Sequence, residues 1–238
     1  MLRKRILVTG TALTIGLGGF TLATMNSAQA ATPTFAAAAT TPTCEGLKAT
    51  IVGTAGDDHL VGTKGADVIA GLAGSDIIEG LGGDDIICAG AGNDGVFGGQ
   101  GSDSIAGGAG ADILAGDAGH DFVRGGTGTD LITGDAGNDF ISGDAGDDGI
   151  LGGKGDDVIE GGSGHDDVTG EAGADIVFGG KGNDSLQGNT GDDSIFGGAG
   201  NDRIWGNAGK DLLVGEGGQD KISGGTGKNE IYQGGVPK

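Results

Sequence analysis

One apolar position recurs at every ninth residue through most of this chain. When residues 53–232 are aligned as twenty copies of nine, starting at Gly53, the eighth column is Leu, Ile or Val in every copy. The fourth column is always Gly, the first is Gly in every copy except the fifth, which has Ala89, and the sixth is Asp in nineteen. Self-similarity at a short fixed period is typical of solenoids, in which each repeat buries its apolar side against its neighbours.

Each copy divides into a turn and a short strand. Columns one to five hold up to three glycines, which tolerate positive φ. Columns six to nine alternate, so the sixth and eighth side chains lie on one side of a strand of about four residues and the seventh and ninth on the other. Two copies would close one coil, with odd copies in one parallel sheet and even copies in another. We therefore predict an all-β fold, a parallel β-solenoid over residues 53–232.

The N-terminal residues predict export from the cell. Residues 1–30 resemble a secretory signal peptide, with three positive charges at 3–5, an apolar run over 6–24 and an Ala-x-Ala cleavage site at 28–30. The alternative is an N-terminal membrane anchor, but the apolar run contains four glycines and no stop-transfer charges follow it. We expect a secreted, extracellular protein.

The remaining segments outside the array predict a linker, a cap and a tail. Residues 31–43 are rich in Ala, Thr and Pro and are expected to be flexible. Residues 44–52 keep Ile51 in the eighth column but lack the Gly and Asp columns, so we interpret them as an atypical capping repeat, which solenoids need at their ends. Residues 233–238 form a C-terminal tail.

The chain contains two cysteines, Cys44 in the cap and Cys88 at the end of the fourth copy. An even count in an exported protein favours a disulfide, here one that ties the cap to the array. The alternative is two free thiols, because the distance between cap and fourth copy does not follow from the sequence.

The charge of the chain narrows the partners that it can bind. A formal net charge of -21 disfavours nucleic acid and anionic membranes, both of which are polyanions. In the predicted solenoid, the sixth-column Asp residues would stack one strand spacing apart, as Asp58 would on Asp76. Two such charges about 4.8 Å apart repel by about 3.5 kcal/mol at an effective dielectric near 20.

A divalent cation would relieve this repulsion. Asp carboxylates and the backbone carbonyls of Gly turns are hard oxygen ligands, which favour several Ca²⁺ ions, whereas Mg²⁺ keeps its water and zinc would need His or Cys. The candidate metal ligands are the Asp residues of the sixth column: Asp58, Asp67, Asp76, Asp85, Asp94, Asp103, Asp112, Asp121, Asp130, Asp139, Asp148, Asp157, Asp166, Asp175, Asp184, Asp193, Asp202, Asp211 and Asp220.

The repeat resembles a known calcium-binding motif. Copies such as residues 98–106 (GGQGSDSIA) and 197–205 (GGAGNDRIW) are similar to the glycine-rich nonapeptide of RTX, or haemolysin-type, proteins. The resemblance implies a parallel β-roll in which Ca²⁺ lies between turns, bound by early-column carbonyls and the sixth-column Asp, and a chain that folds with calcium. This chain departs from large RTX toxins and proteases, since it combines the repeats with an N-terminal signal and no catalytic domain. It is closer to small secreted actinobacterial proteins.

No enzyme motif is found apart from the nine-residue repeat. Residues 90–95 match the dinucleotide fingerprint by letter, but they are in phase with the repeat and no helical pattern follows. His59, His120 and His165 occupy columns expected to be exposed, without a nucleophile or ligand set nearby in the sequence. We predict that the protein is not an enzyme.

The outward columns differ between odd and even copies. Columns seven and nine carry apolar residues at 14 of 20 positions in even copies and at 8 of 20 in odd copies. An apolar even-copy face would suit self-association or a cell-surface partner, although tolerated β-propensity explains the pattern equally well. The leading function is therefore a calcium-binding module. The alternative is an adhesin or a surface- or ice-binding solenoid, although an ice- or surface-binding solenoid would need a regular array of outward Thr residues, which is lacking.

Overall fold

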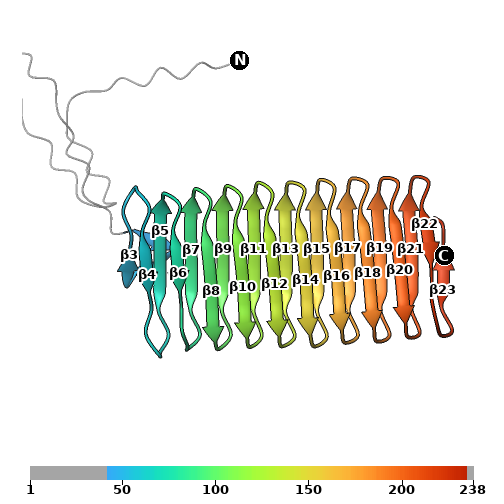
Figure 1. Ribbon diagram of the computed structural model, residues 1–238, viewed down its shortest axis with the longest axis horizontal. Helices are drawn as coiled ribbons and strands as arrows, with labels where there is room; N and C mark the ends of the chain where they lie inside the picture. The colour runs from blue at the N-terminus through green and yellow to red at the C-terminus, as the bar shows by residue number, and fades with distance from the viewer. Residues whose placement is uncertain (1–41, 235–238) are drawn as a thin grey trace, which may run out of the picture. The chain divides into compact units, whose positions relative to one another are not determined.

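The computed structural model describes residues 42–234, which form the all-β parallel β-solenoid predicted from the nine-residue period (Figure 1). The odd copies build a ten-stranded sheet: β4 (His59–Val61), β6 (Ile77–Glu79), β8 (Gly95–Gln100), β10 (Ile113–Ala118), β12 (Leu131–Ala136), β14 (Gly149–Lys154), β16 (Asp167–Ala172), β18 (Ser185–Thr190), β20 (Arg203–Ala208) and β22 (Lys221–Ser223).

The even copies and one strand of the cap build an eleven-stranded sheet: β3 (Ile51–Val52), β5 (Val68–Ala73), β7 (Ile86–Ala91), β9 (Ser104–Ala109), β11 (Phe122–Thr127), β13 (Phe140–Ala145), β15 (Val158–Ser163), β17 (Ile176–Lys181), β19 (Ser194–Ala199), β21 (Leu212–Gly217) and β23 (Glu230–Tyr232). The chain crosses from one sheet to the other at every turn, and the strand arrows of the two sheets point in opposite directions (Figure 1).

Strand register follows the repeat without a slip. Each residue pairs with the residue two copies away, as Val123 does with Ile141 and Ile159 with Val177. A one-residue slip would turn every aliphatic side chain outward, so the eighth column fixes the register. The core is accordingly a stack of these aliphatic residues between the two sheets, fully or almost fully buried from Ile69 to Leu213. Among the described residues of this column, only the members at the two ends, Ile51, Leu60, Ile222 and Ile231, are partly or largely exposed.

The strands are longer than the sequence predicts. Most run for six residues, from the seventh column of one copy to the third column of the next, rather than about four. Pairing continues because the first-column glycine lets neighbouring coils approach, and the strand then bends at the second column. Nine non-glycine residues adopt φ between 66° and 83° at that bend: Leu72, Leu81, Asp117, Asp135, Asp144, Glu171, Asn189, Asn207 and Glu216.

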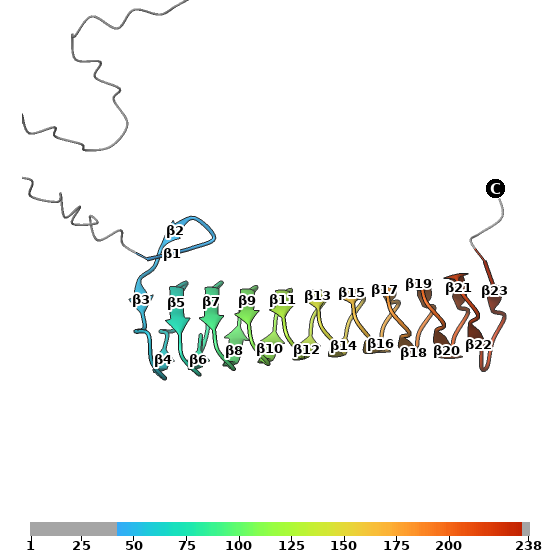
Figure 2. The same cartoon turned by 90° about the horizontal axis from the view of Figure 1, so that it is seen from above.

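The cap has two parts with different folds. Ile51 stacks on Ile69 and extends the even-copy sheet by one strand, as a capping repeat would. Residues 43–48 instead form an antiparallel hairpin of β1 (Thr43–Cys44) and β2 (Leu47–Lys48), which lies outside the solenoid beside β5 and β7 (Figure 2). Without the Gly and Asp columns these residues cannot form the tight repeat turn, which explains why they leave the coil.

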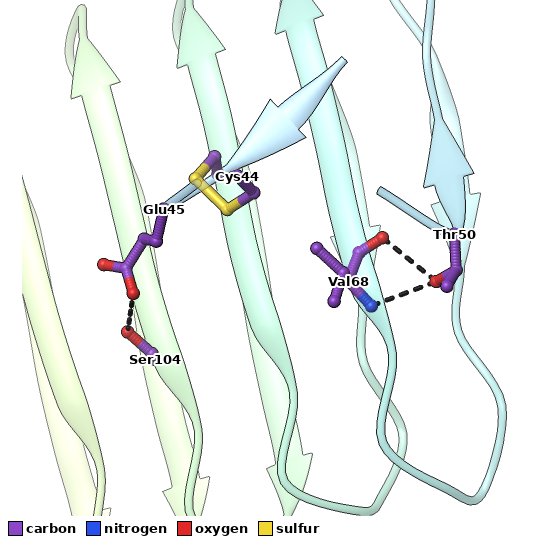
Figure 3. The surroundings of a disulfide bond; sticks show 6 residues. Cys44, Glu45, Thr50, Val68 and Ser104 are labelled. Carbon is purple, nitrogen blue, oxygen red and sulfur yellow. Dashed lines mark hydrogen bonds between the residues drawn. A yellow bond between two sulfur atoms is a disulfide. The ribbon is translucent and has the colours of Figure 1, made fainter. Parts of the chain in front are cut away.

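A disulfide fastens this hairpin to the even-copy sheet. Cys44 is bonded to Cys88 of β7, with the two Cα atoms 5.6 Å apart (Figure 3). Nearby, the Ser104 hydroxyl donates a hydrogen bond to Glu45, and the Thr50 hydroxyl donates to the carbonyl oxygen of Val68 (Figure 3). The hairpin therefore covers the N-terminal end of the outer face of this sheet.

The predicted signal peptide, most of the predicted linker and the end of the predicted tail lie outside the described residues. Within residues 42–234, no helix has the length and apolar character required to span a membrane.

Candidate metal centre

The sixth-column Asp residues form two hydrogen-bonded ladders, one at each edge of the solenoid. The backbone N–H of each Asp donates to Oδ1 of the Asp two copies later, as Asp121 does to Asp139 at 2.8 Å and Asp139 to Asp157 at 2.9 Å. The ladders extend from Asp58 and Asp67 to Asp220 and Asn229. The structure thus places the predicted ligands in the stack that the period implies, all buried except Asp58 and Asp220 at the ends.

The second carboxylate oxygen of these residues lacks a hydrogen-bond partner. Oδ2 is buried and unpartnered in seventeen of them, every sixth-column Asp from Asp76 to Asp220. A buried carboxylate oxygen without a partner costs free energy comparable to or larger than a lost hydrogen bond. Seventeen unpartnered acceptors at a regular spacing are an arrangement that a positively charged ligand would satisfy.

The free oxygens lie so close to the first-column glycine that a side chain there would collide with them. A methyl group placed on the first-column Gly161 would lie 2.6 Å from Oδ2 of Asp166 in the same copy and 2.7 Å from the carbonyl oxygen of Gly179, two copies later. At Gly152 the corresponding distances to Asp157 and Gly170 are 2.6 and 2.7 Å. We call the place where these two oxygens converge the cradle of its copy. A carboxylate oxygen and a carbonyl oxygen converge on it, which is a donor set suited to Ca²⁺.

Burial destabilises the ionised form of these carboxylates. It raises the pKa of Asp121 and of Asp157 from 3.8 to about 7, against the opposing effect of the backbone N–H bond and with a further rise from neighbouring Asp charges. By the same cause the pKa rises to about 6 at five more positions: Asp85, Asp112, Asp148, Asp193 and Asp202. A cation in the cradles would favour the ionised form instead.

No group of three or more His, Cys, Asp or Glu side chains converges on one point among residues 42–234. Each cradle instead brings together one carboxylate oxygen and a backbone carbonyl oxygen. The unpartnered Oδ2 atoms mark these positions.

The first two copies differ from the rest. There Oδ2 of Asp58 accepts hydrogen bonds from the N–H (2.6 Å) and hydroxyl (2.9 Å) of Thr54, and Oδ2 of Asp67 accepts the same pair from Thr63. The repeat pattern does not single out these threonines. The available signal was the second column, in which they are the only β-branched residues.

A second ladder runs along the fifth column and contains two of the histidines. Asp147 Oδ1 accepts the N–H of His165 at 2.8 Å, and Nδ1 of His165 accepts the N–H of Asn183 at 2.8 Å. His120 Nδ1 accepts the N–H of Asn138 in the same way. His59 is exposed and pairs with Glu79 at 2.8 Å. These contacts stabilise turns and do not bring a histidine to the cradles.

Both outer faces expose apolar side chains. On the even-copy sheet, Phe122 stacks on Phe140 with ring centroids 5.1 Å apart, and Phe178 on Phe196 at 5.2 Å. The odd-copy sheet exposes Phe97, Ile113, Leu131 and Leu151, which line a shallow groove of about 580 Å³. Ile113 and Leu131 are 55% and 58% exposed, against 39–40% for Phe122, Phe140, Ile176 and Phe178 on the outer face of the even-copy sheet. The greater apolar count of the even-copy sheet therefore does not make it the more exposed apolar face.

The repeat array matches a known family over most of the chain. Residues 50–235 are covered by overlapping matches to the model of the RTX calcium-binding nonapeptide repeat. A comparison with curated proteins gave no match.

Proposed function

Because the chain belongs to the family of RTX calcium-binding nonapeptide repeat proteins, we propose that it is a secreted protein whose β-roll folds around several Ca²⁺ ions. The sixth-column Asp residues supply carboxylate oxygens in the cradles, and the first-column residues supply carbonyl oxygens. The protein acts as a binding module rather than as an enzyme.

The unpartnered Oδ2 atoms are the observation that carries this proposal. They are buried, repeat at the spacing of the coils and face backbone carbonyl oxygens across a glycine. Calcium ions accept six to eight oxygen ligands at flexible geometry, whereas Mg²⁺ demands a near-ideal octahedron and gives up its water reluctantly. A continuous stack of carboxylates and carbonyls therefore favours calcium over magnesium.

Calcium would supply the stability that the ion-free fold lacks. Each cradle brings a buried negative charge close to the next one in its ladder, and the raised pKa values of Asp121 and Asp157 express the penalty. Binding free energy at sites that exist only in the folded chain is also folding free energy. We expect folding and calcium binding to occur together.

Adjacent acidic residues allow a matched test. Asp148 is buried in a cradle with a free Oδ2, whereas its neighbour Asp147 is exposed in the fifth column. Equilibrium dialysis of the disulfide-intact protein should show one fewer calcium ion for Asp148→Asn and an unchanged number for Asp147→Asn. Equal losses in both variants, or no calcium retained in the presence of magnesium, would refute the proposal.

Secretion rests on separate support. The N-terminal sequence has the features of a signal peptide, and the Cys44–Cys88 disulfide is of the kind that persists outside the cytosol. Extracellular fluids also contain enough calcium for weak sites to fill. Fractionation of the producing cells, with mass analysis of the exported chain, tests the cleavage after Ala30.

The stacked phenylalanines favour a second candidate function, self-association or docking to a cell surface through the even-copy sheet. The pairs on β11 and β13 and on β17 and β19 place partly exposed aromatic rings side by side on the outer face of this sheet, and exposed apolar surface is typical of interaction sites. Phe140→Glu combined with Phe178→Glu should then lower the oligomeric mass or abolish surface binding. Unchanged values in both assays would remove this candidate.

A further inference from the structure

The first two turns of the array satisfy their Asp residues without an ion. Thr54 and Thr63 each donate a backbone N–H at 2.6 Å and a hydroxyl at 2.9 Å to the Oδ2 that is free in later copies. Each threonine hydroxyl also bonds within the turn, where it accepts the N–H of the fourth-column glycine, Gly56 or Gly65, at 3.2 Å. The N–H and hydroxyl donors of these threonines therefore satisfy the oxygen that a cation would satisfy in the later copies.

The threonines adopt this turn because of their shape. The second column of every later copy takes a positive φ, which glycine adopts freely and which Leu, Asp, Glu and Asn adopt at some cost. A β-branched side chain resists that conformation, and neither Thr54 nor Thr63 has a positive φ. The turn is rearranged as a whole, since Gly56 and Gly65 also lack the positive φ of the fourth-column glycines that follow.

The fifth copy blocks its cradle in another way. Ala89 replaces the first-column glycine and is fully buried, so it places a methyl group at the cradle, where the other copies have no side chain. At glycine positions such as Gly161 and Gly152, a methyl group would lie within 2.7 Å of both converging oxygens. The Ala89 carbonyl is unaffected and still faces the cradle of the third copy. Ala89 therefore closes the cradle of Asp94 and no other.

We infer that Asp58, Asp67 and Asp94 hold no calcium, so that the calcium array begins at the third copy and has one gap, at the fifth. This inference rests on the proposed function and refines it. A count of Asp residues in the sixth column overestimates the ions, because the residue at the first or second column decides whether a cradle is open. The array begins beside the hairpin that the Cys44–Cys88 disulfide fastens to β7.

Asparagine substitutions separate filled cradles from closed ones. Native mass spectrometry of the disulfide-intact protein in calcium counts the ions in each variant. Asp112→Asn and Asp121→Asn, in open cradles on the odd-copy and even-copy edges, should each lose one ion. Asp58→Asn, Asp67→Asn and Asp94→Asn should leave the number unchanged. A loss at Asp67 or Asp94 equal to that at Asp121 would overturn the inference while leaving the proposed function intact. No loss at Asp112 and Asp121 would overturn both.

Opening the closed cradles gives an independent test. Ala89→Gly and Thr63→Gly should each gain one calcium ion, since glycine removes the methyl group from the cradle in one case and permits the positive-φ turn in the other. Adding Asp94→Asn to the first variant, or Asp67→Asn to the second, should return the number to that of the wild-type protein. An unchanged number in both glycine variants would overturn the inference, even if the loss series agreed with it.

Discussion

Replacing Asp157 with Asn should change the stability of the fold in opposite directions with and without calcium. Asp157 is 1% exposed, its Oδ1 accepts the N–H of Asp139 at 2.9 Å, and its Oδ2 has no partner. The last copy shows that Asn fits the ladder, because Oδ1 of Asn229 accepts the N–H of Asp211 at 2.9 Å. The substitution therefore keeps the backbone contact and removes the charge.

The magnitude follows from the pKa. Burial and the neighbouring Asp charges raise the pKa of Asp157 from 3.8 to about 7, which corresponds to about 4 kcal/mol against the ionised form above pH 7. Water and salt at the turn edge screen the repulsion, so we expect Asp157→Asn to stabilise the calcium-free fold by about 2 kcal/mol. In calcium, the loss of one site removes about 2.7 kcal/mol of binding free energy when free calcium is 100 times its Kd, so after the gain of the ion-free fold the net effect is a destabilisation of about 0.7 kcal/mol.

Urea unfolding in millimolar calcium measures the free energy of unfolding of the calcium-bound protein. In chelator, trimethylamine N-oxide drives the ion-free chain to fold, and a titration with it measures the free energy of unfolding without calcium. Asp156→Asn is the control, because Asp156 is an exposed fifth-column residue next in the chain. If Asp157→Asn changes the free energy of unfolding in the same direction with and without calcium, the assignment of Asp157 to a cation cradle is refuted. The same holds if Asp156→Asn behaves like Asp157→Asn.

Three further predictions follow from the same geometry. Since the folded-state pKa of Asp121 lies above 3.8, the ion-free fold binds protons that the unfolded chain does not, and its stability should rise as pH falls from above 7 towards 4. A trimethylamine N-oxide folding midpoint in chelator that does not fall between pH 7.5 and pH 5 would contradict this. Replacing Cys44 and Cys88 with Ser opens a crosslink of sequence separation 44 and should cost about 4 kcal/mol, with hydrogen exchange rising near the hairpin; an unchanged urea midpoint argues against it. Ile141→Ala should cost about 2 to 5 kcal/mol and the exposed Ile113→Ala much less, so equal losses would mean that the core is misassigned.

The regular parts of the fold follow from the period alone. An aliphatic residue at every ninth position permits only one register, and a sheet built from every second copy places each Asp beside the Asp two copies later. The pairing of Asp121 with Asp139 could therefore be predicted from the sequence. The length of the strands could not, because the extension through the first three columns depends on backbone pairing between coils.

The exceptions depend on local conformation that no repeated pattern encodes. Thr54 and Thr63 look like ordinary substitutions in a variable column, and only the φ angles and hydrogen bonds show that they satisfy Asp58 and Asp67. Residues 43–48 lack the period altogether, so the sequence indicated a cap and did not indicate a hairpin on the outer face.

Coupled folding and binding is the central claim, and a calcium titration followed by far-UV circular dichroism tests it most directly. The chain without residues 1–30 and with its disulfide intact is taken from chelator into millimolar calcium at pH 7.5, with magnesium in a parallel series. We predict a cooperative gain of β signal with calcium and none with magnesium. A full β signal already present in chelator would contradict the account, because the buried Asp ladders would then tolerate their own charge.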